Sequence, residues 1–136
     1  MSKVAVITGS SGGIGRALVK TYLNDGYFVL GLDISPSKSP VSEFYAEIDV
    51  NLLMFSKDTA YRDSVLGKIK ERLPHKVNKF VLINNAAEQI LKSVAEIEWQ
   101  DWENSLAVNT VAPFFLVQGL TAELIESCGH VINISS

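Results

Sequence analysis

The architecture of this chain is decided by residues 4–15, which read VAVITGSSGGIG. The apolar and β-branched residues 4–8 predict a short buried strand, and the glycines behind them predict a tight turn. After the turn, Ile14, Leu18 and Tyr22 recur at helical spacing, and Asp25-Gly26 ends the pattern. The stretch therefore predicts a strand, a glycine-rich turn and a helix over residues 13–24 in direct succession.

The rest of the chain continues the alternation of strands and helices. Apolar runs of strand length occupy residues 27–32, 44–48, 80–83 and 130–134, and helical patterns occupy about 57–73 and 99–126. Such alternation favours a parallel sheet covered on both faces by right-handed crossovers. We therefore predict an α/β fold with a doubly wound parallel sheet (Rossmann-like) in which five strands are present. The connection 35–43 contains two prolines and is too short for a full crossover helix.

The glycine-rich turn lies where a pyrophosphate could meet the amino end of the first helix. Glycines there let the backbone approach phosphate groups without a Cβ atom in the way. No Lys-Ser or Lys-Thr follows them, which disfavours a mononucleotide P-loop. A glycine-rich turn alone is a weak signal, but its position between strand and helix favours a dinucleotide.

Asp33 lies 18 residues after Gly15, at the carboxyl end of the second predicted strand. A carboxylate at that position is typical of a side chain that binds the ribose 2′-hydroxyl of NAD. No basic residue follows Asp33 until Lys38, so nothing evident would neutralise the extra phosphate of NADP, although Arg16 could reach a phosphate. We predict NAD in preference to NADP; the alternative for Asp33 is a cap on the turn before Pro36.

These motifs and those that follow resemble the short-chain dehydrogenase/reductase family over essentially the whole chain. Residues 8–15 are similar to its Thr-Gly-x-x-x-Gly-x-Gly loop, and 84–87 resemble its Asn-Asn-Ala-Gly segment, with Ala87 in place of the glycine. Asp49-Val50 stands where the family contacts adenine. The resemblance implies a cofactor site made of Gly9, Ser11, Gly13, Ile14, Asp33, Asp49, Val50, Asn85 and Ala86.

Two residues match the catalytic set of the resembling family. Asn109 shares a helix face with an apolar stripe that includes Leu106 and Leu116, so we expect it to be buried and bonded to main chain or water. In the family the matching Asn helps to position a water in a proton relay. Ser136 aligns with the serine that steadies the substrate carbonyl oxygen, with Ser135 as the weaker match.

The family's proton donor, the tyrosine of a Tyr-x-x-x-Lys motif, has no match in these residues. None of the four tyrosines has a lysine four positions later. We therefore expect residues 1–136 to be one dinucleotide-binding (Rossmann) domain, truncated before the catalytic Tyr/Lys helix and inactive as written. The last predicted strand, 130–134, would then be an apolar edge prone to association.

Composition narrows the possible partners. A net charge of -3 with scattered basic residues gives no field for nucleic acid or anionic lipid. No apolar run reaches the length of a membrane span, and no secretory leader is evident, so we expect no membrane partner and a cytoplasmic location. Cys128 excludes an internal disulfide, and we expect it to be a buried thiol. The resemblance implies a small-molecule alcohol or carbonyl substrate and a homo-oligomer.

Three functions stay open. The first is an NAD(P)-dependent oxidoreductase that transfers hydride between the nicotinamide and an alcohol or carbonyl substrate. The second is a non-catalytic nucleotide-binding or partner-binding remnant. The third is a sugar-nucleotide epimerase of the extended family type, because Gly9, Gly12 and Gly15 also fit the Thr-Gly-x-x-Gly-x-x-Gly pattern. The segments 84–86, 108–110 and 131–136 favour the first function over the third.

Overall fold

Five parallel strands form one sheet in the computed structural model, which describes residues 2–34 and 42–135. The strand order is β3-β2-β1-β4-β5, with β1 in the centre. The strands are β1 (Ser2–Thr8), β2 (Phe28–Asp33), β3 (Tyr45–Asp49), β4 (Val77–Asn84) and β5 (His130–Asn133). The predicted doubly wound α/β fold is thereby confirmed, while most of the proline-containing connection 35–43 falls outside the described residues.

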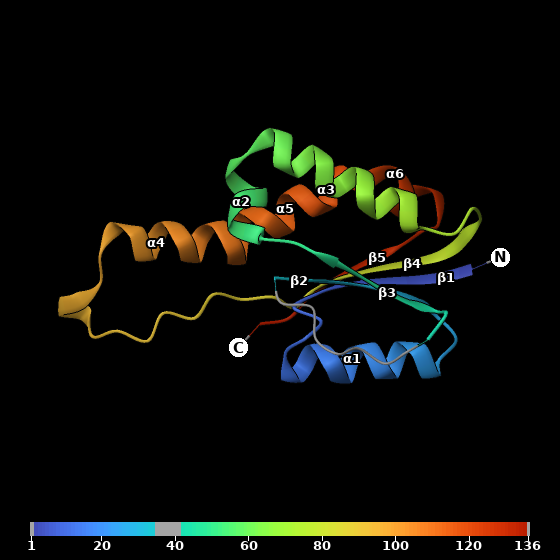
Figure 1. Ribbon diagram of the computed structural model, residues 1–136, viewed down its shortest axis with the longest axis horizontal. Coiled ribbons are helices and arrows are strands. Elements are labelled where there is room, and N and C mark those ends of the chain that lie inside the picture. The colour runs from blue at the N-terminus through green and yellow to red at the C-terminus, as the bar shows by residue number, and fades with distance from the viewer. Residues whose placement is uncertain (1, 35–41, 136) are drawn as a thin grey trace.

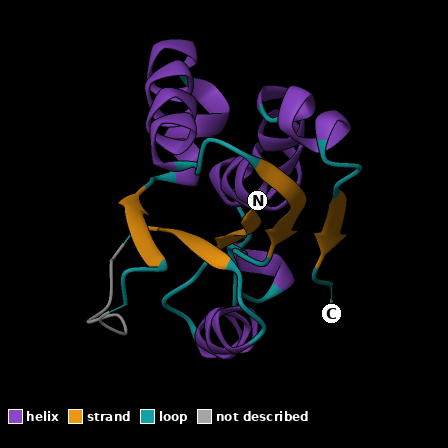
Figure 2. Cartoon of the chain, turned by 90° about the vertical axis from the view of Figure 1, so that its right-hand side faces the viewer, coloured by secondary structure: helices purple, strands orange, loops and turns teal. Residues whose placement is uncertain are grey.

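Helices cover both faces of the sheet, as Figures 1 and 2 show. Helix α1 (Gly13–Asn24) lies on one face, and α2 (Leu52–Lys57), α3 (Thr59–Arg72), α5 (Ala112–Gly119) and α6 (Thr121–Glu126) lie on the other. Because side chains alternate along a strand, Val4 and Val6 pack with Leu116 on one face, whereas Ala5 and Ile7 pack with Val19 beneath α1. The central strand is thus buried on both sides.

The helix predicted over about 57–73 is present as α3, and the helix that precedes it, α2, was not predicted. Asn51 caps α2 by accepting the Met54 N–H at 3.2 Å, and Asp58 caps α3 by accepting the Tyr61 N–H at 3.0 Å. Asp58 has extended backbone angles, φ -110° and ψ 113°, which end α2 at the residue before it. Both caps are polar side chains that accept a backbone N–H, so each helix begins directly after its cap.

The helix predicted over 99–126 is also interrupted. It consists of α4 (Trp99–Leu106), a π-helical turn η2 (Ala107–Val111), α5 and α6, and a short 3-10 helix, η1 (Val94–Glu96), precedes it. Pro113 follows the π-helical turn, and because proline has no N–H the carbonyl four residues earlier loses its usual helical donor. Leu120, with φ -109° and ψ 16°, separates α5 from α6.

The segment that ends in α4 projects beyond the sheet (Figure 1). As a result Trp99 and Trp102 are 75% and 58% exposed. Cys128 is likewise exposed, at a positive φ of 48°, so its predicted burial was wrong. Strand β5 lies at the sheet edge with all four residues exposed, as predicted for that strand. Within the described ranges, none of the helices has the length and apolar character needed to cross a bilayer.

Candidate cofactor site

A cavity of about 790 Å³ opens at the carboxyl ends of the central strands. The chain runs from β1 outward to β2 and β3 and then returns to β4 on the other side of β1, so the cavity lies at the point where strand order reverses. Ligands of open α/β sheets bind at such a point. The volume falls within the range of roughly 300–1,000 Å³ that is common for small-molecule sites.

Seven of the nine residues implied as cofactor contacts line this cavity: Gly9, Gly13, Ile14, Asp33, Val50, Asn85 and Ala86. Ser11 and Asp49 do not line it. Asp49 ends β3 beside Asp33 in the strand register, but its side chain is exposed. Only its neighbour Val50, 1% exposed, faces the cavity.

The glycines of the turn have different physical roles. Gly9 has a φ of +65°, and a Cβ there would lie 2.9 Å from the Ala86 Cα. A Cβ on Gly15 would lie 1.9 Å from the Gly9 carbonyl oxygen. Gly13 has nothing within 4 Å of a Cβ position. The fold therefore requires Gly9 and Gly15, whereas the open space at Gly13 is available to a ligand.

The amino end of α1 faces this open space without a capping side chain among the described residues. Its N-cap is Gly12, no acidic residue stands in the first turn, and the Gly12 carbonyl accepts the Arg16 N–H at 2.9 Å. The N–H groups at the start of a helix and the helix dipole both favour an anion. A phosphate group fits this end of the cavity.

Asp33 is oriented by the glycine-rich turn itself. The backbone N–H of Ser11 donates to Asp33 Oδ2 at 2.9 Å, and the Asp33 carbonyl accepts the Val50 N–H at 2.9 Å. The Ser11 N–H is therefore used to position the carboxylate. A negative charge thus stands at the end of β2, next to the amino end of α1, at the distance along the chain that a ribose contact requires.

The segment after β4 is bonded closely to the end of β1. Thr8 Oγ1 accepts the N–H groups of Asn85 and Ala86 at 3.0 and 2.9 Å. The Asn85 side-chain amide donates to the carbonyls of Thr8 and Gly9 at 3.2 and 3.3 Å. Asn85 therefore contributes to the cavity by fixing the shape of the turn as well as by lining it.

Asn109 is exposed, so the predicted burial was wrong, because α4 and the π-helical turn extend past the sheet. The prediction that it bonds to main chain is confirmed. Asn109 Oδ1 accepts the Glu88 N–H at 2.7 Å, and its Nδ2 donates to the Glu88 carbonyl at 3.0 Å. This pair of bonds holds the loop after β4 against the π-helical turn at the edge of the cavity. Ser136, the other predicted catalytic residue, lies outside the described residues.

Several cavity residues had not been identified from the sequence. On the β3 side they follow Val50 into α2, and on the β4 side they follow Ala87 toward α4: Asn51, Leu52, Leu53, Glu88, Gln89, Asn104 and Val108. For the residues on the β3 side, the helix cap formed by Asn51 is the one feature of the sequence that could have predicted their position. Nothing local in the sequence marks Glu88, because its role arises from contact with Asn109.

The residues present fit a dinucleotide. A phosphate would lie in the open space at Gly13, against the uncapped amino end of α1. A ribose would lie next to it, at the carboxylate of Asp33 on the β2 side. Apolar walls from Val50 and Leu53 lie beyond Asp33 and suit a flat base. The part of the cavity on the β4 side, lined by residues 85–89, is left for the second nucleoside.

Comparison with known proteins agrees with this geometry. The family model described as short chain dehydrogenase matches residues 3–136. An uncharacterized oxidoreductase of Thermotoga maritima is 30% identical over 136 residues, which is 98% of this chain and 53% of the relative. The chain therefore spans about half the length of this curated relative.

Two solved structures resemble the chain closely. One is a 4-hydroxyisoleucine dehydrogenase complexed with NADH, with a TM-score of 0.80, 26% identity, and coverage of 99% of this chain and 56% of the other. Another is an oxidoreductase of the short chain dehydrogenase/reductase family from Brucella ovis in complex with a partially ordered NAD, with a TM-score of 0.80, 28% identity, and coverage of 96% and 61%. With the family match extending over nearly all of its residues, this chain belongs to the short-chain dehydrogenase family of oxidoreductases.

Proposed function

We propose that this chain is the cofactor-binding part of an NAD(H)-dependent oxidoreductase acting on an alcohol or carbonyl substrate. The bound nicotinamide would supply or accept the hydride. In support, the two solved structures named above are described with NADH or NAD, and the cavity has room on both sides of the glycine-rich turn. We assign Gly9, Gly13 and Ile14 to the pyrophosphate and the Asp49-Val50 segment to the adenine wall.

The observation that carries this proposal is the carboxylate of Asp33 in the cavity, positioned by the Ser11 N–H at 2.9 Å. A carboxylate accepts hydrogen bonds from the 2′- and 3′-hydroxyls of ribose, whereas it repels a 2′-phosphate. We therefore propose NAD as the cofactor in preference to NADP.

Asn109 and Ser136 are proposed as part of the catalytic set, Asn109 through a water held near the π-helical turn and Ser136 through its hydroxyl. Since residues 1–136 contain no Tyr-x-x-x-Lys, we expect these residues alone to bind cofactor without turning over substrate. Two alternatives share the glycine-rich turn. One is a non-catalytic nucleotide-binding or partner-binding protein, and the other is an extended-type epimerase. They differ from the proposed oxidoreductase in the reaction, if any, that the bound ligand undergoes.

Isothermal titration calorimetry of the purified chain with NADH, NADPH and AMP tests the proposal. We expect NADH to bind at least tenfold more tightly than NADPH, because one charge repulsion and one lost hydrogen bond to a carboxylate each reduce affinity. Equal affinities would remove the specificity claim. If the chain binds none of the three ligands, a partner-binding function is better supported than a nucleotide-binding one.

We also propose that the protein forms a homo-oligomer through α4 and α5. Trp102, Leu106 and Phe114 are 58%, 47% and 61% exposed, and the extra residue of the π-helical turn keeps Phe114 on the same side as the other two. A second copy presenting the same apolar face would cover these side chains about a twofold axis. Sedimentation velocity should show dissociation for Trp102→Glu and none for the control Ile125→Glu on α6, which is 72% exposed.

A further inference from the structure

The π-helical turn that carries Asn109 is stabilised from outside its own helix. The Ala107 carbonyl accepts the Ala112 N–H, five residues later, and also accepts the hydroxyl of Ser56 from α2. The Ser56 hydroxyl lies 2.9 Å from the Leu52 carbonyl as well, so its one proton is shared between the two carbonyls. Ala107 is 6% exposed and Ser56 is 8% exposed, so water has little access to this contact. A carbonyl oxygen has two lone pairs, and here both are occupied by donors from the protein.

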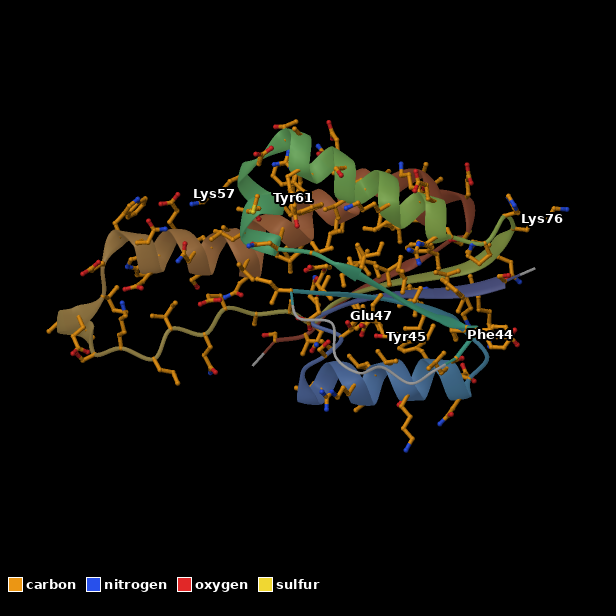
Figure 3. All side chains as sticks on the ribbon, in the orientation of Figure 1. Phe44, Tyr45, Glu47, Lys57, Tyr61 and Lys76 are labelled. Atoms are coloured by element: carbon orange, nitrogen blue, oxygen red, sulfur yellow. The ribbon has the colours of Figure 1, made fainter. Side chains whose placement is uncertain are left out.

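Two further sets of contacts hold the end of α2 in place, one to α4 before the turn and one from α3. Lys57 Nζ lies 2.6 Å from Glu103 Oε1 on α4, and Figure 3 shows the Lys57 side chain directed from α2 toward α4. Arg62 donates to the carbonyls of Phe55 and Ser56 at 2.9 and 2.8 Å. These bonds hold the last residues of α2 in place.

The Arg62 guanidinium also stacks on the ring of Phe115 on α5, 3.5 Å from its centroid. Helix α2 and Arg62 thus contact the long helical segment before, within and after the π-helical turn. We call Ser56, Lys57 and Arg62 the α2 clamp. Of its three members, only Ser56 bonds to the backbone of the turn itself.

The turn decides where the Asn109 side chain points. One residue inserted into an α-helix rotates every later side chain by about 100° relative to those before it. In the observed register Asn109 makes both hydrogen bonds to the Glu88 backbone, at 2.7 and 3.0 Å. Without the inserted residue Asn109 would not keep this orientation, and the loop at the β4 side of the cavity would lose its support.

We propose that Ser56 is a positioning residue for Asn109. Its buried hydroxyl holds the π-helical turn in register, and thereby holds the Glu88 segment that walls the cavity on the side of the second nucleoside. This inference rests on the proposed dinucleotide site for its consequence in binding, but the structural link from Ser56 to Glu88 can be tested without any nucleotide.

The test is amide hydrogen exchange, followed by NMR, in wild-type protein, Ser56→Ala, Ser56→Thr and the control Ser64→Ala. Ser64 is exposed on α3, so its variant makes the same chemical change away from the clamp. We expect Ser56→Ala to raise the exchange rate of the Glu88 amide about tenfold relative to that of Val6 in β1. Ser56→Thr, which keeps the hydroxyl, should restore the wild-type ratio.

An unchanged ratio in Ser56→Ala, or an equal rise at Val6, would overturn the proposal, because the substitution would then act only on overall stability. If Ser56→Ala does not fold, the wild-type protein still decides. Its Ser56 hydroxyl proton should exchange slowly enough to show a nuclear Overhauser effect to the Ala112 amide. A rapidly exchanging hydroxyl would overturn the proposal.

Calorimetry then separates this inference from the proposed function. For Ser56→Ala we expect the NADH dissociation constant to rise about fivefold or more while that of AMP changes less than twofold, because AMP does not reach the Glu88 segment. Equal weakening of both ligands would mean that Ser56 acts through the α2 wall, and the positioning role would be wrong. If wild-type protein binds neither ligand, the proposed function fails, and the exchange measurement alone decides the role of Ser56.

Discussion

Asp33 Oδ2 accepts the backbone N–H of Ser11 at 2.9 Å, so the carboxylate at the end of β2 and the glycine-rich turn after β1 position one another. The two residues are 22 positions apart in sequence. Through this bond the phosphate-binding and ribose-binding parts of the cavity form one unit. Changes at Asp33 should therefore affect both cofactor choice and the order of the turn.

Two substitutions at Asp33 separate these effects. Asp33→Asn keeps an oxygen for the Ser11 N–H but removes the charge, and we expect it to raise NADPH affinity while NADH affinity falls only about threefold to tenfold. Asp33→Ala also leaves the Ser11 N–H without this acceptor, and NADH affinity should fall further. Calorimetry with both cofactors measures this, with Asp63→Asn on the exposed face of α3 as the control. Unaltered cofactor preference in Asp33→Asn would contradict the assignment.

The turn offers a matched pair of glycine substitutions. Gly15→Ala places a Cβ 1.9 Å from the Gly9 carbonyl oxygen, and we expect the free energy of unfolding to drop by about 1–3 kcal/mol or more. Gly13→Ala meets nothing within 4 Å, so its stability should equal that of wild type while NADH binding weakens. Urea denaturation and calorimetry measure the two quantities. A stable Gly13→Ala protein with full NADH affinity would show that no phosphate group approaches Gly13.

The bonds between Asn109 and Glu88 predict a protease-sensitive variant. Asn109→Ala removes both bonds, and the segment 85–98 should then open more often. Lys92 lies in this segment and gives trypsin a cleavage site whose rate can be followed by mass spectrometry. We expect cleavage after Lys92 to accelerate about fivefold or more over wild type. The exposed residue Asn78 on β4 provides the control Asn78→Ala, which should behave as wild type.

The start of α4 predicts a response to acid. The pKa of Asp101 is lowered, first by the hydrogen bond that its carboxylate accepts from the Glu98 backbone N–H and then by Lys92. Because the folded protein has the lower pKa, this stabilisation is complete above the pKa of the unfolded chain and is lost as the pH falls through the folded value. Both tryptophans of the chain, Trp99 and Trp102, are on α4, so their fluorescence reports the transition.

Two variants, one at each partner of the ion pair, should change that titration in different ways. Asp101→Asn should lose the acid transition of the tryptophan fluorescence. Lys92→Met removes the hydrogen bond and the charge of Lys92 and keeps the backbone bond, so its transition should move to higher pH without reaching that of an unperturbed aspartate. If all three proteins titrate together, the fluorescence follows some other group.

Strand β5 predicts concentration-dependent association. Val131 and Ile132 are 40% and 39% exposed at the sheet edge, where unpaired backbone groups favour pairing with another strand. We expect Ile132→Lys to reduce light scattering of concentrated samples, because a charged edge opposes pairing. Ile125→Lys, at a side chain that is 72% exposed on α6, should leave the scattering as it is in wild type.

The sequence by itself determined the strand–turn–helix start, the parallel sheet and the place of Asp33 at the end of β2. These features depend on neighbouring residues, because β-branched runs, glycines in a turn and helical spacing are local patterns. Right-handed crossovers then leave few ways to arrange such strands and helices in one sheet. The start of α2 could also have been recognised, since Asn51 and Asp58 are both suitable caps. The predicted helix over about 57–73 matched α3, which Asp58 caps, whereas α2, which Asn51 caps, was not predicted.

Only the tertiary structure decided the surroundings of Asn109, Glu88 and Ser56. An apolar helical stripe specifies a face but not what covers it, and α4 extends past the sheet, so the stripe is exposed at Trp102 and buried at Leu116. The hydrogen bonds from Asn109 to Glu88 and from Ser56 to Ala107 join residues 21 and 51 positions apart. Such contacts exist only after three separate segments have packed together, which is why no local pattern in the sequence contains them.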